Sequence, residues 1–306
     1  MQARPAPRAT TLPLWDTHTH VQPSAHATDA YFARNGITGA HPSGTVADLI
    51  RQMDACGVER AMIVSWIPAR QLVEDAVAAG RDRDAAVADV VREWRELNAW
   101  AVAAARAHPE RFDCVVGLEP ALMSPDVLRA EVESGLAAGA TGLKVAPFSL
   151  WMHADDPLME PVWQLATSHD VPVLSECGAH PQDAGGDWGH PKYFPSVLRS
   201  YPTLRLQLAH AGIGGEDTLI ELMGQWPGVV TDTALRLGSM MDPGYTRTNV
   251  VELIRRLGID RVMFGSCFPL GDVATHAAEL RSLPLTDDEL YAVAYGNAAH
   301  FFRRAT

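Results

Sequence analysis

Two histidines separated by a single residue are the clearest chemical signal in the sequence. His18 and His20 lie in the segment WDTHTH, at the end of a short apolar run near residues 12–18. Residues two apart on a β-strand point to the same side, so both imidazoles can reach one metal ion. The pair therefore predicts a metal site at the end of the first strand.

Further residues of metal-ligand type end later strand-like runs. Glu176 ends the run at 171–178, and His210 ends the run at 204–212. Imidazole and carboxylate together are typical ligands of catalytic metals, and we predict that His18, His20, Glu176 and His210 bind the ion. Taken singly, such residues are often structural: Asp232 could orient a loop, and Lys144 could pair with Glu176. The further metal or catalytic candidates are Cys267, Lys144, Glu119, His180, Asp232 and Asp272.

Aromatic residues gather in the segments that follow the strand-like runs. We expect them to line an apolar pocket for a small-molecule substrate, although anchoring of the loops is the alternative. These residues are Trp66, Phe148, Trp151, Trp188, Tyr193 and Phe268.

The elements that must position these residues alternate regularly along the chain. Several strand-like runs are nearly continuous in Val, Leu and Ile, which is typical of parallel strands buried on both faces. The runs lie near 12–18, 60–67, 113–120, 142–147, 171–178, 204–212, 228–234 and 261–269. Helical patterns fill the gaps, at 45–55, 72–108 with a break near Gly80, from Pro125 onward, 157–169, 216–226, 248–257 and 286–295. This alternation predicts an α/β protein with a (β/α)8 TIM barrel, in which chemistry occurs at the carboxyl ends of the strands.

Composition narrows the class of protein. The 306 residues include 25 Lys and Arg and 37 Asp and Glu, for a net charge of −12, which argues against nucleic acid and anionic membranes as partners. No apolar run is long enough to span a membrane. The four cysteines form no CxxC pair, so we expect reduced thiols and a cytoplasmic protein. We expect residues 1–11 to be a flexible arm, 12–306 to be a single catalytic domain, and the glycine-containing segment 180–193 to be a lid.

Several segments together resemble the amidohydrolase superfamily, in the amidohydrolase-related branch that includes aromatic and aminocarboxymuconate semialdehyde decarboxylases. They are WDTHTH, GLKVAP, LQLAHAG, RVMFGSCFP and YGNAAHFF, and the resemblance covers nearly the whole chain. It implies an amidohydrolase-like TIM barrel with metal at its mouth, His18 and His20 as ligands, and His210 as a ligand or an acid/base.

Two positions depart from the family pattern. Glu176 stands where the fifth strand usually ends in His, and Cys267 stands where the eighth strand usually ends in Asp. In hydrolase members that Asp binds metal and takes a proton from the attacking water, and a thiol is a poor base for this purpose. The change argues against ordinary hydrolysis and against metal-dependent decarboxylation.

The chain is also similar to TIM-barrel non-haem di-iron monooxygenases, which implies hydroxylation in natural-product biosynthesis. Our first hypothesis is therefore a monooxygenase with two iron ions, an apolar substrate and a separate electron donor. The resemblance implies that the substrate is linked to CoA, as an acyl-CoA. The alternatives are a hydrolase or carboxy-lyase with zinc or manganese, and a non-catalytic ligand-binding barrel. The resemblance also implies a homodimer.

Overall fold

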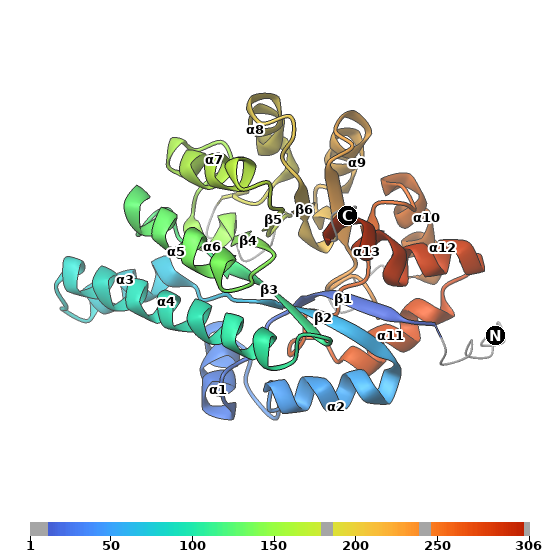
Figure 1. Ribbon diagram of the computed structural model, residues 1–306, viewed down its shortest axis with the longest axis horizontal. Helices are drawn as coiled ribbons and strands as arrows, with labels where there is room; N and C mark the ends of the chain where they lie inside the picture. The colour runs from blue at the N-terminus through green and yellow to red at the C-terminus, as the bar shows by residue number, and fades with distance from the viewer. Residues whose placement is uncertain (1–11, 179–185, 239–245, 303–306) are drawn as a thin grey trace. The chain divides into compact units, whose positions relative to one another are not determined.

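Eight short strands carry the architecture of the computed structural model, which describes residues 12–178, 186–238 and 246–302 (Figure 1). The strands pair in chain order, and the β3–β4, β4–β5, β5–β6 and β7–β8 pairs are parallel. This is the (β/α)8 TIM-barrel fold that the sequence predicted. The strands are β1 (Leu14–Thr19), β2 (Val58–Val64), β3 (Phe112–Gly117), β4 (Gly142–Val145), β5 (Val173–Ser175), β6 (Leu206–Leu208), β7 (Val229–Asp232) and β8 (Val262–Met263).

Helices follow the strands along the chain, as the predicted alternation requires. They are α1 (Ala25–Arg34), α2 (Val46–Cys56), α3 (Ala69–Ala78), α4 (Arg83–Ala107), α5 (Pro125–Ala137), α6 (Pro147–Leu150), α7 (Glu160–Ser168), α8 (Phe194–Ser200), α9 (Glu216–Gln225), α10 (Arg247–Leu257), α11 (Val273–Ser282), α12 (Asp287–Tyr291) and α13 (Asn297–Phe302). Short 3₁₀ turns are η1 (Pro157–Met159), η2 (Pro191–Tyr193) and η3 (Ala209–Gly212), and η4 (Ala292–Gly296) is a π-turn. The sequence patterns did not predict α1, α6, α8, α11 or α13.

Local sequence signals explain where the predicted helices begin and end. The Ser124 side chain accepts a hydrogen bond from the backbone of α5, and Pro125 takes the first helical position. The predicted break near Gly80 separates α3 from α4: Gly80 adopts a left-handed φ of 86°, and Asp82 caps α4.

The described residues divide into two compact units: those up to Met62 together with those from Thr231 onward, and those between Ile63 and Val230. Their boundaries fall inside β2 and β7. The interpretation of 12–306 as one domain stays a prediction, and the expected arm at 1–11 lies outside the described residues.

In the first unit, β1 and β8 both pack on η4. The helices α2 and α11 pack against each other (Figure 1). The β1 core residue Trp15 is 1% exposed, and its ring lies 5.8 Å from that of Tyr295.

In the second unit, α4 packs on β3. The Asn98 side chain of α4 bonds to both backbone groups of Gly117, donating to its carbonyl at 2.9 Å and accepting from its N–H at 2.8 Å. A Cβ at Gly117 would lie 2.1 Å from the Trp94 ring, so the close approach of helix and strand requires glycine. No helix among the described residues is long and apolar enough to cross a membrane.

Candidate metal centre

The backbone at the carboxyl ends of β1 and β8 brings three donor side chains together. The Cys267 N–H, beyond the end of β8, donates to the His18 carbonyl in β1 at 2.9 Å, and the His20 N–H donates to the Phe268 carbonyl. The metal-binding atoms of His18, His20 and Cys267 all lie within 4.8 Å of one another, and all three residues are buried. The cysteine that replaces the family aspartate therefore lies beside the predicted histidine pair.

Asp232, at the end of β7, orients the first histidine. Its Oδ2 lies 3.2 Å from His18 Nδ1, and its Oδ1 accepts from the Ala234 N–H at 3.0 Å. An ionised carboxylate can only accept, so the hydrogen bond assigns a proton to Nδ1 and leaves the lone pair on Nε2. A carboxylate behind a histidine is a common arrangement at metal sites, because it fixes the tautomer and raises the basicity of the ligand.

The Nε2 side of the His18 ring faces His20. The two Nε2 atoms are 3.1 Å apart, and the ring centroids are 4.9 Å apart at an angle of 66°. Two nitrogens bound to one tetrahedral zinc ion at 2.0–2.1 Å would be about 3.3 Å apart. The observed spacing, with a sulfur nearby and burial on all sides, fits a divalent metal ion.

Asp16 supports the centre from behind and was missed by the sequence reasoning. Its Oδ1 accepts from the His18 N–H at 3.2 Å and from the Ser266 N–H at 3.0 Å, so one carboxyl group ties together the two donor-bearing segments. Burial raises its pKa to about 7, while hydrogen bonds from Ser266 oppose that rise. Its place in WDTHTH, at the same strand parity as the two histidines, was the available signal.

Tyr31 of α1 lies beside His20, with ring centroids 5.8 Å apart. Burial raises the pKa of Tyr31 well above its usual value, and the charge of Cys267 raises it further. The phenol therefore remains a neutral hydrogen-bonding group next to the three donors.

The second unit holds four other predicted residues, which follow or lie in β3 to β6. Glu119, Lys144, Glu176 and His210 are all buried, with exposures of 1, 3, 3 and 5%. Burial raises the pKa of Glu119 well above its usual value, against smaller opposing effects of Trp94 and Arg70.

Two of these four occupy constrained positions. The backbone at Gly189 lies so close to Glu176 that a Cβ there would lie 2.6 Å from Oε2. His210 has a left-handed φ of 64°, which a residue with a Cβ rarely adopts and which is enriched at functional sites.

The predicted aromatic residues pack on neighbouring loops. Trp66 stacks on Phe148 at 5.8 Å and donates from its indole N–H to Ser149 at 2.7 Å. The Arg70 guanidinium lies 5.0 Å above the Trp151 ring.

A separate aromatic cluster surrounds His153. Tyr193 stacks on that imidazole at 3.8 Å, and Trp188 lies 4.8 Å from it. Phe268, in the first unit, is fully buried. These contacts match the loop-anchoring alternative, and the substrate pocket stays a prediction.

The remaining predictions concern Asp272, His180 and the lid. Asp272 is exposed, and its carboxylate accepts from the Thr275 N–H at 2.7 Å as the N-cap of α11, so the structure does not bring it to the three donors. His180 lies outside the described residues, as does much of the predicted lid. Within the described part of that segment, Gly189 forms a bridge with Gly178, whose N–H donates to the Gly189 carbonyl at 2.9 Å.

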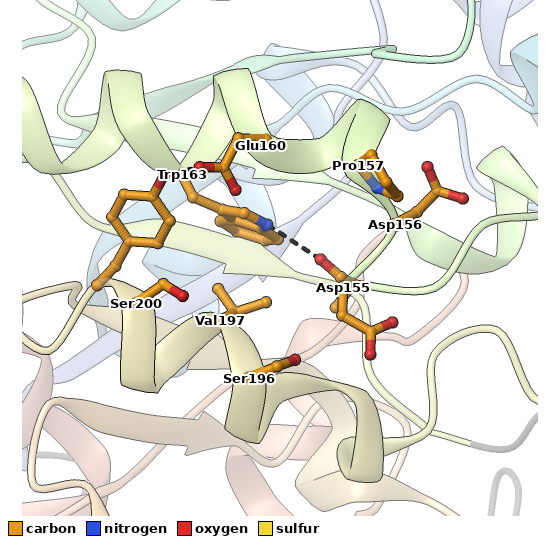
Figure 2. A pocket seen from close by; sticks show the side chains of 10 residues that line it. Asp155, Asp156, Pro157, Glu160, Trp163, Ser196, Val197 and Ser200 are labelled. Atoms are coloured by element: carbon orange, nitrogen blue, oxygen red, sulfur yellow. Dashed lines mark hydrogen bonds between the residues drawn. The ribbon is translucent and has the colours of Figure 1, made fainter.

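A groove of about 320 Å³ lies between the η1–α7 segment and α8 (Figure 2). Asp155, Asp156 and Glu160 give it an acidic lining, and Trp163 donates from its indole N–H to the Ala154 carbonyl at 3.0 Å. None of the predicted site residues lines this groove.

Comparison with known proteins places the chain in a family. A family model described as amidohydrolase matches residues 15–304. The chain belongs to this amidohydrolase family. The resemblance drawn from the sequence motifs is thereby confirmed. A search of curated proteins finds no match for this amidohydrolase.

Solved structures share its fold at low sequence identity. One is 5-carboxyvanillate decarboxylase LigW from Sphingomonas paucimobilis, with a TM-score of 0.65 and 17% identity over 96% of this chain and 99% of that one. Another is a dihydroxybenzoic acid decarboxylase from Polaromonas sp. JS666, solved with manganese and 2-nitroresorcinol, with a TM-score of 0.69 and 16% identity over 95% and 96%. An uncharacterized TIM-barrel protein from Bordetella bronchiseptica has a TM-score of 0.71 and 15% identity over 95% and 98%.

Proposed function

We propose that this amidohydrolase is a metal-dependent carboxy-lyase, which removes CO₂ from a hydroxy-substituted aromatic carboxylic acid. The observation that carries the proposal is the buried pair of His18 and His20, whose Nε2 atoms are 3.1 Å apart with Asp232 behind the first ring. The similarity to decarboxylases that share the fold supports the substrate class. A divalent ion held there supplies a Lewis acid that orients the substrate and stabilises developing negative charge.

The residues of this chain divide the remaining work. Asp232 keeps the proton of His18 on Nδ1, so that Nε2 faces the ion. Asp16 holds the two donor segments together through its hydrogen bonds to His18 and Ser266. The resemblance to the decarboxylases implies that His210 is the acid/base histidine, which would deliver a proton to the carbon that loses CO₂.

The replacement of the family aspartate by Cys267 favours lyase over hydrolase chemistry. Hydrolysis needs a base that activates water, and a thiol does this poorly. Decarboxylation involves no attacking water molecule. It needs instead a proton donor and groups that stabilise the developing negative charge. The sequence argument had counted the cysteine against both reactions, and the distinction between them makes the lyase the better proposal.

The di-iron monooxygenase that the sequence favoured has no support from the structures compared. Two iron ions, a CoA-linked substrate, an electron donor and a homodimer stay predictions. Zinc or manganese, the alternative metals, accord better with the proposed lyase.

Dependence on oxygen separates the two reactions. We would incubate the metal-loaded protein with a panel of hydroxybenzoates, with and without O₂, and measure CO₂ release and deuterium incorporation from D₂O. The lyase releases CO₂ equally in both atmospheres and places one deuterium on the ring carbon. Turnover that requires O₂ and yields a hydroxylated product would overturn it.

A pair of histidine variants tests the proton donor. His210→Asn should reduce CO₂ release by about 10²–10⁴-fold, the usual contribution of a general acid. His169→Asn, at an exposed helix end, is the matched control and should leave the rate unchanged.

A further inference from the structure

We propose that Cys267 binds the metal ion as a thiolate, so that the site has two nitrogen donors and one sulfur donor and selects Zn²⁺ over Mn²⁺. This inference rests on the proposed metal site at His18 and His20. Cys267 stands where other members of the family usually have aspartate. On this proposal the replacement changes which metal binds and does not abolish activity.

The backbone fixes the sulfur in place. The Cys267 N–H donates to the His18 carbonyl at 2.9 Å, and the next residue accepts from His20. The cysteine backbone is thus bonded directly to the histidine-bearing strand, and rotation of its side chain is the main remaining freedom. All three donor atoms fall within 4.8 Å of one another.

Two backbone features bring the cysteine segment close to His18. Cys267 has a left-handed φ of 60°, a strained conformation that persists where the surrounding structure enforces it. Gly265 packs so tightly that a Cβ there would lie 3.2 Å from the His18 Cβ.

The surroundings suit a bound thiolate. Cys267 is 2% exposed, so an ion bound there is shielded from water. The Nδ1 side of the His18 ring is held by Asp232, and the Tyr31 ring lies 5.8 Å from that of His20. On binding, the thiol loses its proton to solvent and the sulfur lone pair forms the bond to the metal, so the uptake of M²⁺ releases one proton.

The chemistry of the donors sets the choice of metal. Thiolate sulfur and imidazole nitrogen are common zinc ligands, with Zn–S near 2.3 Å and Zn–N at 2.0–2.1 Å, whereas Mn²⁺ prefers carboxylate, carbonyl and water oxygens. Catalytic zinc sites use three protein ligands, and the three donors here would likewise leave room for substrate on a bound ion. The Polaromonas decarboxylase, by contrast, was solved with manganese.

Cobalt substitution tests the metal–sulfur bond without an activity assay. The full-length protein is stripped with a chelator and loaded with Co²⁺ alone, and occupancy is measured by mass spectrometry. We expect a sulfur-to-cobalt charge-transfer band in the near ultraviolet at one Co²⁺ per chain. Cys267→Ser should lose the band. Cys56→Ser should keep it, because this cysteine lies at the end of α2 and its Sγ donates to the Gln52 carbonyl, a bond that serine can also make.

The preference between metals provides the second readout. Competition between Zn²⁺ and Mn²⁺ should favour zinc in the wild-type protein. Cys267→Asp restores an oxygen donor and should shift the Zn²⁺/Mn²⁺ affinity ratio toward manganese by about tenfold or more. An unchanged ratio in this variant would overturn the selection of zinc by sulfur.

The outcomes separate this inference from the proposed function. Full Co²⁺ occupancy with no charge-transfer band, or a band that survives in Cys267→Ser, overturns thiolate ligation and leaves the lyase intact. No Co²⁺ or Zn²⁺ binding at all overturns the metal centre, and the lyase with it. If Cys267→Ser fails to fold, zinc X-ray absorption of the wild-type protein decides the question: one sulfur at about 2.3 Å is expected, and a shell of nitrogen and oxygen only refutes it.

Discussion

Replacing Asp232 by asparagine converts a hydrogen-bond acceptor into a donor behind His18. The Ala234 N–H, 3.0 Å from Oδ1, holds that position for an oxygen. The amide nitrogen must then face His18 Nδ1, where Oδ2 now lies at 3.2 Å. A donor there drives the imidazole proton from Nδ1 to Nε2, the nitrogen that lies 3.1 Å from His20 Nε2 and that we assign to the metal.

The size of the effect follows from the burial of the pair. The side chains of His18 and Asp232 are 1% and 0% exposed, so water cannot take over the lost contact. If the amide flips instead, its nitrogen opposes the Ala234 N–H, and a buried donor loses its partner. Loss of such an outer partner typically weakens metal binding by 10–100-fold, or about 1.4–2.8 kcal/mol.

The assay is a competition titration of the apo-protein with Zn²⁺ against a chromogenic chelator. We expect Asp232→Asn to raise the Kd for zinc by about 10–100-fold. Asp156→Asn removes the same charge at the N-cap of η1, where asparagine also caps well, and should bind zinc as the wild type does. Equal zinc affinity in Asp232→Asn and the wild type would refute the tautomer argument. Zinc binding weakened equally in Asp232→Asn and Asp156→Asn would mean that the loss of negative charge alone explains the effect.

Three further predictions concern stability. Gly189→Ala places a Cβ 2.6 Å from Glu176 Oε2 and should lower the free energy of unfolding by about 1–3 kcal/mol. Gly224→Ala in α9, where a Cβ would have nothing within 4 Å, should raise it by about 0.5–1 kcal/mol. Thermal melts that rank the two variants the other way would contradict this reading of the packing. Asn98→Ala leaves the two backbone groups of β3 without their buried partner and should cost about 2–4 kcal/mol in urea unfolding, so a loss below 1 kcal/mol, roughly the net value of one hydrogen bond, would show that they find other partners. Burial raises the pKa of Cys114 from 9.0 to about 12, so this thiol ionises first in the unfolded chain, and the free energy of unfolding should fall as the pH rises above 9. Cys114→Ala should reduce the slope of unfolding free energy against pH by up to about 1.4 kcal/mol per pH unit. Identical slopes for the two proteins would refute the shift.

Periodicity and punctuation in the sequence were sufficient for the fold. The eight apolar runs became β1 to β8, and the break near Gly80 appeared between α3 and α4. Strand and helix periods are local properties, and buried parallel strands leave continuous apolar runs that are readable without any partner. The helices α1 and α11 were missed because each lies in a long segment after a strand, where the sequence analysis had assigned only loop or site residues.

For the metal site too, the sequence determined one part and the tertiary structure the rest. The type and spacing of His18 and His20 were readable from the sequence, because residues two apart on one strand must share a side. The proximity of Cys267 and Asp232 to that pair was decided by contacts of β1 with the β7 and β8 segments, which lie more than 200 positions later in the sequence. The role of Asp16 was likewise visible only once its carboxyl group met the Ser266 N–H. Sequence determined which donors exist, and hydrogen-bonded strands far apart in the chain determined which of them face one another, because side-chain distances depend on strand register that no local pattern encodes.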